Sequence, residues 1–250
     1  MWSYNILNYS IILVLLCLSL QLQANEIRVA AAANLRYVLP ELASDFEKQT
    51  NTRLLISYAA SGSLTTQILH GAPFDVFLSA SPDYIKRLEN AKLTQEKAVD
   101  FAQAQLVLFS SYDSPLTIEG GMVSLKVAIE QNKLNKIAIA NPRHAPYGKA
   151  AQTELEKIGI WKKIQPYLLI AENASQAVQF SLISSVDAGI VPYGHIIQTP
   201  IATKGHFILL DETLQQQAVL LKGASVLAKQ FMQYMQSQQA KSILLQYGFL

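Results

Sequence analysis

A regular alternation of short apolar runs with helical patterns constrains the fold of this chain more than any other feature. Seven runs are four to seven residues long and bounded by turn residues, which is typical of buried strands. Because strands separated by helices are joined by crossover connections, we expect parallel α/β sheets flanked by helices. The seven runs are residues 27–33, 53–58, 74–78, 105–110, 137–140, 167–170 and 188–191.

Composition and charge exclude several classes of protein. The chain has 250 residues and an apolar fraction of 50%, so it is neither disordered nor short of a core. Its 20 basic and 18 acidic residues leave a net charge of +2, which gives no basic surface for nucleic acid. A single cysteine and four scattered histidines offer no disulfide, zinc cluster or metal-binding helix. We therefore expect no cofactor and no nucleic-acid partner.

The first 24 residues resemble a secretory signal. An apolar run of ten residues, Ile11–Leu20, is followed by a polar stretch that ends in Ala24 at the expected cleavage position. The run is too short to span a bilayer comfortably. No Lys or Arg precedes it, so an uncleaved membrane anchor is the alternative. A lipid anchor on Cys17 is disfavoured because the bulky Leu16 precedes it. Cleavage would leave an exported, cysteine-free chain that begins at Asn25.

Small, hydroxyl-bearing and amide-bearing residues occupy four turns between a strand and a helix. The amino end of a helix has free N–H groups and a partial positive charge, so it favours anions. In open α/β sheets, ligands bind beyond the carboxyl ends of the strands. Ordinary helix capping accounts for any one of these turns, so the inference of an oxyanion site requires all four to converge. The turns are Ala33–Asn34, Ser61–Ser63, Pro146–Gly148 and Asn173–Ser175.

The first of these turns leads into a helical stripe between Leu35 and Phe46. We expect Asn34 to cap this helix, because an Asn side chain can accept a hydrogen bond from a free backbone N–H. Pro40 falls within the stripe, and proline predicts that the helix bends or that its regular part begins there.

Several ordered segments together resemble the family of periplasmic molybdate-binding proteins. The resemblance covers nearly all of residues 26–249, so it is specific at the level of the family. It begins with IRVAAAANL and continues through the second strand and turn, which read RLLISYAASGS. The later segments that carry it are IAIANPRHAPYGKAAQTELEKIG, ENASQAVQFSLISSVDAGIV and QAKSILLQYGF.

The resemblance implies a type II periplasmic binding protein fold. Two α/β lobes, each a mostly parallel sheet flanked by helices, would hold the ligand in the cleft between them. Residues 25–104 with 217–250 would form the first lobe, and 105–216 the second. The implied protein is a periplasmic monomer without catalytic activity. It would bind molybdate or tungstate and deliver the anion to the permease and ATPase of an inner-membrane ABC transporter.

The resemblance also implies which residues meet the anion. Asn34 and Ser61 match side-chain donors, Ala174 matches a backbone N–H donor, and Ala33 is a further backbone candidate. Some members supply a tyrosine hydroxyl directly after Gly-Ile-Val, but here Pro192 holds that place and offers no donor. The resemblance therefore implies that Tyr147 supplies the phenol, with Tyr193 as a displaced alternative. Molybdenum would enter only as the bound molybdate.

The chemistry of the anion agrees with such a donor set. Molybdate is a deprotonated dianion whose oxygens only accept hydrogen bonds, so neutral N–H and O–H donors suit it. Hydrogen phosphate is disfavoured because its proton would face a donor. Sulfate differs mainly in size, which the sequence does not reveal, so a site for sulfate or phosphate is the first alternative. A sensor or adhesin domain is the second. No nucleophile elbow, P-loop or dinucleotide motif supports an enzyme.

Overall fold

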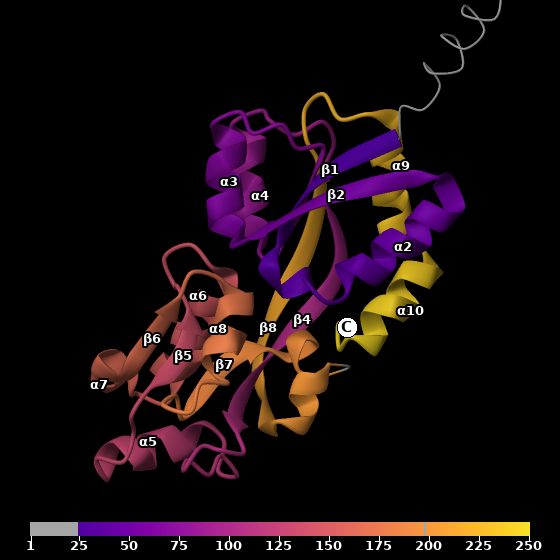
Figure 1. Cartoon of the computed structure of the whole chain (residues 1–250). Coiled ribbons are helices and arrows are strands. Elements are labelled where there is room, and N and C mark those ends of the chain that lie inside the picture. Colours follow the sequence, from indigo (N-terminus) through magenta and orange to yellow (C-terminus); the bar gives the residue numbers. More distant parts are fainter. Residues whose placement is uncertain (1–24, 198) are drawn as a thin grey trace, which may run out of the picture.

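The computed structural model describes residues 25–197 and 199–250, so the predicted signal segment lies outside the described residues. The strands form one mixed eight-stranded sheet in the order β2-β1-β3-β8-β4-β7-β5-β6, with helices packed around it (Figure 1). Among the described residues, no helix is both long enough and apolar enough to cross a bilayer. The strands are β1 (Asn25–Ala32), β2 (Thr52–Ala59), β3 (Val76–Ser79), β4 (Val99–Ser111), β5 (Ile137–Ala140), β6 (Leu168–Ala171), β7 (Ala188–Pro192) and β8 (Gly205–Leu220).

Parallel pairs lie at the two ends of the sheet and antiparallel pairs at its centre. Strand β1 pairs in parallel with β2 and β3, and β5 pairs in parallel with β6 and β7. The central strands β4 and β8 are 13 and 16 residues long and pair antiparallel. Both run through the middle of the molecule and connect its two halves (Figure 1).

Helices cover the sheet in each half. In the half that contains β1, α3 and α4 lie on one side of the strands and α2, α9 and α10 on the other (Figure 1). The half that contains β5 carries α5 to α8. The α-helices are α2 (Leu39–Thr50), α3 (Ser61–Leu69), α4 (Pro82–Asn90), α5 (Met122–Glu130), α6 (Pro146–Lys157), α7 (Trp161–Ile164), α8 (Ala174–Phe180), α9 (Val226–Met235) and α10 (Gln238–Gln246). Short 3-10 helices are η1 (Ala33–Leu35), η2 (Gln165–Tyr167), η3 (Tyr193–His195) and η4 (Pro200–Thr203).

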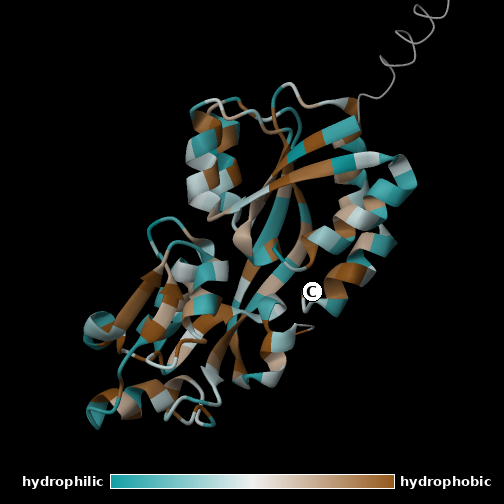
Figure 2. Ribbon diagram, in the orientation of Figure 1, coloured by the Kyte–Doolittle hydropathy of each residue, from teal (hydrophilic) through white to brown (hydrophobic). Residues whose placement is uncertain are grey.

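Successive side chains along a strand point to opposite faces of the sheet, and this alternation determines which residues form the core on each side. On β1, Val29 belongs to the cluster with α2, while the next residue, Ala30, packs with Leu64 of α3 and Ile85 of α4. Both faces of this strand are therefore buried, as parallel strands between two helix layers require. Figure 2 shows that the strands of the sheet are mainly apolar and that the outer helices are more polar.

The structure confirms the predicted α/β class with flanking helices, and each of the seven predicted strands overlaps an observed one. Sequence analysis did not identify β8, the longest strand, which pairs antiparallel with both β3 and β4. The regular part of α2 begins beside Pro40, which was one of the two outcomes expected there. The predicted lobe boundaries at 104/105 and 216/217 fall inside β4 and β8, and that division remains a prediction.

Candidate anion-binding site

The four turns singled out in the sequence lie at the carboxyl ends of two parallel strand pairs. Two follow β1 and β2 in one half of the molecule, and two follow β5 and β6 in the other. Parallel strands end at the same edge, so each half presents its two turns together. The sheet thus explains why residues more than a hundred positions apart reach one place.

A very small cavity of about 10 Å³ lies where the turns meet. Five of the six residues predicted for the site line it, and the sixth, Tyr193, does not. The remaining walls are mainly alanines, which keep the cavity narrow and leave backbone close to its interior. Its lining residues are Ala32, Ala33, Asn34, Ala60, Ser61, Ala80, Ala145, Pro146, Tyr147 and Ala174.

Ser61 is oriented as a hydrogen-bond donor. The residue opens α3 and is fully buried. Its Oγ accepts a hydrogen bond of 3.1 Å from the backbone N–H of Ala80. Because that bond occupies a lone pair of the oxygen, the hydroxyl hydrogen remains to be donated into the cavity. Its backbone carbonyl is held separately by Thr65, whose Oγ1 donates at 2.8 Å.

Tyr147 contributes a phenol that stays protonated. It lies in the first turn of α6 and is 2% exposed. Burial raises the pKa of this phenol far above its usual value, and the neighbouring side chain of Asn34 lowers it only in part. The group is therefore neutral and carries a hydrogen to donate throughout the physiological pH range.

Asn34 lies within η1 and does not cap the following helix, contrary to the sequence prediction. Its Nδ2 instead donates a hydrogen bond of 2.9 Å to Oε1 of Gln216 on β8. This pairing is possible because η1 turns the side chain inward, where it is 2% exposed. The amide nitrogen carries two hydrogens, so one remains after the bond to Gln216.

Hydrogen bonds of neighbouring residues position Ala33 and Ala174. Ala174 begins α8, whose N-cap Asn173 accepts a hydrogen bond from the N–H of Gln176, so the N–H of Ala174 lies at the open end of the helix. Ala33 follows β1, and its carbonyl accepts a hydrogen bond of 2.8 Å from Oγ of Ser175. With its carbonyl held this way, Ala33 keeps a fixed position beside the cavity.

Tyr193 does not line the cavity with the other predicted residues. It begins η3, and its ring packs at 5.7 Å from that of Phe207. A Cβ added at Gly248 would approach this ring to 2.5 Å, so the half-buried tyrosine packs against the carboxyl end of the chain. The proline at position 192 is buried and ends β7 just before this tyrosine. These contacts are those of a packing residue.

Direct hydrogen bonds join the two halves beside the cavity. The N–H of Gly62 donates to the carbonyl of His144 at 2.9 Å, and Oγ of Ser63 lies 3.4 Å from Nδ1 of the same histidine. A Cβ at Gly62 would come within 2.6 Å of that carbonyl oxygen, so only glycine allows this approach. His144 precedes the third turn by two residues, and nothing in the sequence marks this contact.

His195 supports the first turn from behind. It is fully buried, and its Nε2 donates a hydrogen bond of 3.1 Å to the carbonyl of Asn34. A carbonyl only accepts, so Nε2 carries the proton in the neutral ring. Burial lowers the pKa of His195 to about 4, although the backbone hydrogen bonds to Asn34 and Ala33 raise it in part. Nothing near it in the sequence marks this histidine, because its partner is 161 residues away.

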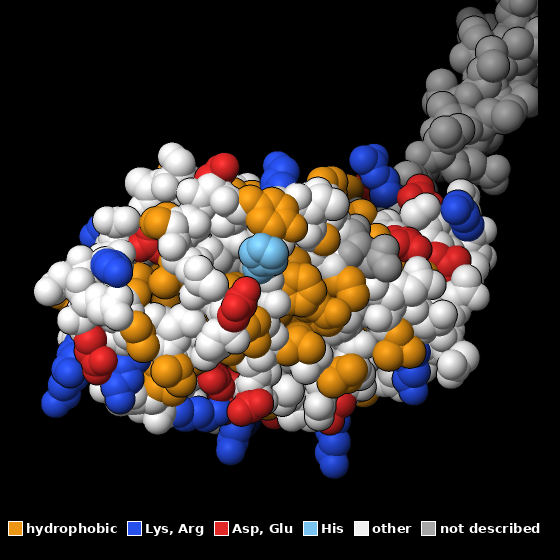
Figure 3. Space-filling view, turned by 90° about the horizontal axis from the view of Figure 1, so that it is seen from below, with side chains coloured by type: hydrophobic (Ala, Val, Ile, Leu, Met, Phe, Trp, Pro, Cys, Tyr) orange, Lys and Arg blue, Asp and Glu red, His pale blue; other side chains and the backbone are white. Residues whose placement is uncertain are grey.

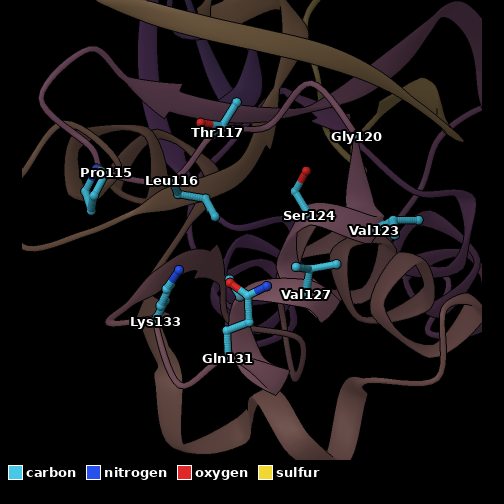
Figure 4. A pocket seen from close by; sticks show the side chains of 10 residues that line it. Pro115, Leu116, Thr117, Gly120, Val123, Ser124, Val127, Gln131 and Lys133 are labelled. Atoms are coloured by element: carbon cyan, nitrogen blue, oxygen red, sulfur yellow. The ribbon is translucent and has the colours of Figure 1, made fainter.

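A wider groove of about 520 Å³ runs along α5 and shares no residue with the small cavity (Figure 4). Leu116, Val123 and Val127 give it apolar walls, and Lys133 lies at one end. On the face drawn in Figure 3, Lys and Arg alternate with Asp and Glu around the rim, and apolar side chains gather toward the middle. Neither feature offers the converging donors found in the small cavity.

The fold is that of a solute-binding protein. Residues 27–250 match the family model of bacterial extracellular solute-binding proteins, and the chain belongs to this family. The molybdate-binding protein ModA of Rhodobacter capsulatus is 31% identical over 93% of this chain and 91% of that protein. The structure of the periplasmic molybdate-binding protein of Azotobacter vinelandii superposes with a TM-score of 0.81 and 31% identity, covering 90% of this chain and 98% of that one. The Escherichia coli ModA is 27% identical over 90% of this chain and 88% of its own length.

Membership in this family confirms the prediction of a binding protein rather than an enzyme. The family-level resemblance inferred from the ordered motifs is also confirmed. The particular residues that hold a ligand are not identified by the comparisons. The six predicted residues therefore remain predictions, and the geometry around the small cavity is what supports five of them.

Burial of His195 predicts a loss of stability in acid. The unfolded chain takes up a proton at the ordinary histidine pKa of 6.5, whereas the folded chain resists protonation until about pH 4. The contribution to stability is thus present above 6.5 and lost as the pH falls toward 4. We expect this to remove about 3 kcal/mol from the free energy of unfolding. Urea denaturation at several pH values measures it.

The control is His195→Gln, which keeps an N–H donor but does not titrate. This variant should lose less stability than the unmodified protein over the same pH interval. Equal losses in the two proteins would show that other groups cause the acid sensitivity.

Proposed function

We propose that this chain captures molybdate outside the inner membrane and delivers it to an ABC transporter. The observation that carries the proposal is the convergence of neutral donors on one small cavity at the carboxyl ends of two parallel strand pairs. Relatives of similar length are named molybdate-binding proteins, which supports molybdate as the ligand. Tungstate, a tetrahedral dianion of almost the same size, would bind the same donors.

The donor set accounts for recognition of a dianion without a charged side chain in the cavity. None of the ten residues lining it is Asp, Glu, Lys or Arg. Hydrogen bonds from neutral groups to an ionised oxygen are stronger than bonds between neutral groups. Ser61, Tyr147 and Asn34 would donate from side chains, while Ala33 and Ala174 would donate from the backbone. A rigid, narrow set of donors also limits the size of anion that fits.

The two halves of the molecule would act as lobes that close on the anion. Residues 25–104 with 217–250 would form one lobe, and 105–216 the other, with β4 and β8 as the connection. The contacts between Gly62 and His144, and between Ser175 and Ala33, would form on closure. The closed monomer would then dock on the permease of the transporter, whose ATPase drives uptake.

Binding should be selective for molybdate and tungstate. Isothermal titration of the mature protein with molybdate, tungstate, sulfate and phosphate measures the four dissociation constants. We expect molybdate and tungstate to bind with similar affinity and sulfate and phosphate far more weakly. Sulfate that bound as tightly as molybdate would instead assign the chain to transport of another tetrahedral oxyanion.

Ser61→Ala and Tyr147→Phe should each weaken molybdate binding by about 10- to 150-fold. Each change removes one hydroxyl and little volume, and a hydrogen bond to a charged group contributes roughly 1.5–3 kcal/mol. Water entering the gap would bring the effect toward the lower end. Titration of each variant, with its melting temperature as a check on folding, gives the measurement.

Tyr193→Phe is the matched control, because it removes the same phenol hydroxyl at a tyrosine that does not line the cavity. It should change the dissociation constant less than Tyr147→Phe does. The reverse order would mean that Tyr193 supplies the phenol.

Export should remove the first 24 residues and leave Asn25 as the amino terminus. The ten-residue apolar run and the polar stretch ending in Ala24 are the reason for this expectation. Intact mass spectrometry of protein recovered from the periplasm measures the product. A mass that still includes Met1, or that includes a lipid on Cys17, would contradict it.

A further inference from the structure

Gln216 is fully buried at the centre of the molecule, unlike its neighbours of the same type. Gln215 is exposed, and Gln217 is half-buried and donates to Oδ1 of Asp100 at 2.7 Å. Gln216 pairs with Ala102 of β4, next to an irregularity in the ladder between Asp100 and Ala102. Such irregularities re-aim side chains. Burying an amide costs free energy unless its atoms are paired, so the partners of Gln216 indicate what it does.

Both ends of the Gln216 amide are used, and in a fixed direction. Its Nε2 donates a hydrogen bond of 2.9 Å to the carbonyl of Leu214, which can only accept. Oε1 is thereby turned the other way, where it accepts the bond of 2.9 Å from Nδ2 of Asn34. The backbone of β8 therefore dictates, through one glutamine, which end of the Asn34 amide faces β8.

The reverse orientation of Asn34 would bring two acceptor oxygens together. Turning its amide over would place Oδ1 against Oε1 of Gln216, and turning Gln216 as well would place that oxygen against the carbonyl of Leu214. In the observed arrangement, Oδ1 of Asn34 is buried without a partner among the described residues. An unpaired buried acceptor is unfavourable, so the bond to Gln216 outweighs it. The amide nitrogen consequently keeps one hydrogen for the cavity side, where Tyr147 lies.

We propose that Gln216 is a positioning residue for the anion site, holding the Asn34 amide so that it donates rather than accepts. The inference rests on the proposed function, because it assumes an anionic ligand in the small cavity. Gln216 does not line that cavity, so its effect passes through Asn34. Without it, the amide would be free to present Oδ1 to the anion, and the site would lose a donor and gain a repulsive oxygen.

Gln216→Glu tests this inference through the pH dependence of molybdate binding. At about pH 8.5 the new carboxylate would face the carbonyl of Leu214 and add a negative charge near the anion, so binding should weaken about 100-fold. Burial raises the pKa of a carboxyl group. On acidification to about pH 5.5 the protonated group can donate to Leu214 and accept from Asn34, as glutamine does. Binding should then recover to within about tenfold of the unmodified protein.

Gln215→Glu is the matched control. It adds the same charge one residue away on the same strand, but on an exposed side chain. Solvent and salt screen such a charge, so its dissociation constant should stay within about threefold of the unmodified value at each pH.

Gln216→Met provides a second route should the buried carboxyl prevent folding. It keeps the length of the side chain but removes Oε1, and molybdate affinity should fall about tenfold. If Gln216 acts through Asn34, then Gln216→Met should have almost no further effect in an Asn34→Ala background. A general packing defect would lower affinity equally in both backgrounds.

The outcomes of these experiments distinguish a failure of the proposed function from a failure of the positioning role of Gln216. Failure of the unmodified protein to bind molybdate overturns the proposed function. Normal molybdate binding by the unmodified protein, together with additive effects in the double-mutant cycle, overturns the positioning role alone. So does a Gln216→Glu variant that binds with the same affinity as Gln215→Glu at every pH.

Discussion

The long antiparallel ladder between β4 and β8 supports every other feature of this structure. Its two strands pass from one half of the molecule to the other, and each half adds its parallel strands to an outer edge of the ladder. Because the parallel strands of each half end toward the same region, the two sets of turns face one another. The cavity between them is a consequence of how the sheet is assembled, and no single motif creates it.

The side chains in and behind the cavity are uncharged. Ser61 is fixed as a donor by the N–H of Ala80, and burial keeps Tyr147 protonated. His195 stays uncharged behind the first turn, so it adds no positive charge that would attract anions indiscriminately. A dianion in this cavity would be held by geometry and hydrogen bonding, which depend on the shape of the ligand more than on its total charge.

The predictable parts of the site are those whose signals are local. Ala33, Ser61 and Ala174 follow short apolar strands and precede helical patterns, so sequence neighbours suffice to place them at strand ends. Strand β8 escaped prediction because its polar residues, including Asp211 and Glu212, break up the apolar run that marks a buried strand. Whether such a strand is buried depends on the strands that pair with it, which the sequence around it does not reveal.

The hydrogen-bond partners of the site residues could not be predicted either, because they lie far away in the sequence. Asn34 resembled a helix cap because asparagine favours that position, yet the pairing with Gln216, 182 residues away, decides its orientation. Three consecutive glutamines look like a solvated stretch, and only the passage of β8 through the molecule buries the middle one. Tyr147 and Tyr193 are equivalent as residue types, but in the fold only Tyr147 lines the cavity.

Gly62 has a consequence for how long an anion would remain bound. Its lack of a side chain lets the backbones of the two halves hydrogen-bond directly, with the N–H of Gly62 on the carbonyl of His144. An anion held between the halves leaves only after such contacts break, and affinity differences among related complexes arise mostly from dissociation rates. The absence of a side chain at Gly62 would thus help to set how long a bound anion stays, and hence the time available for it to reach a transporter.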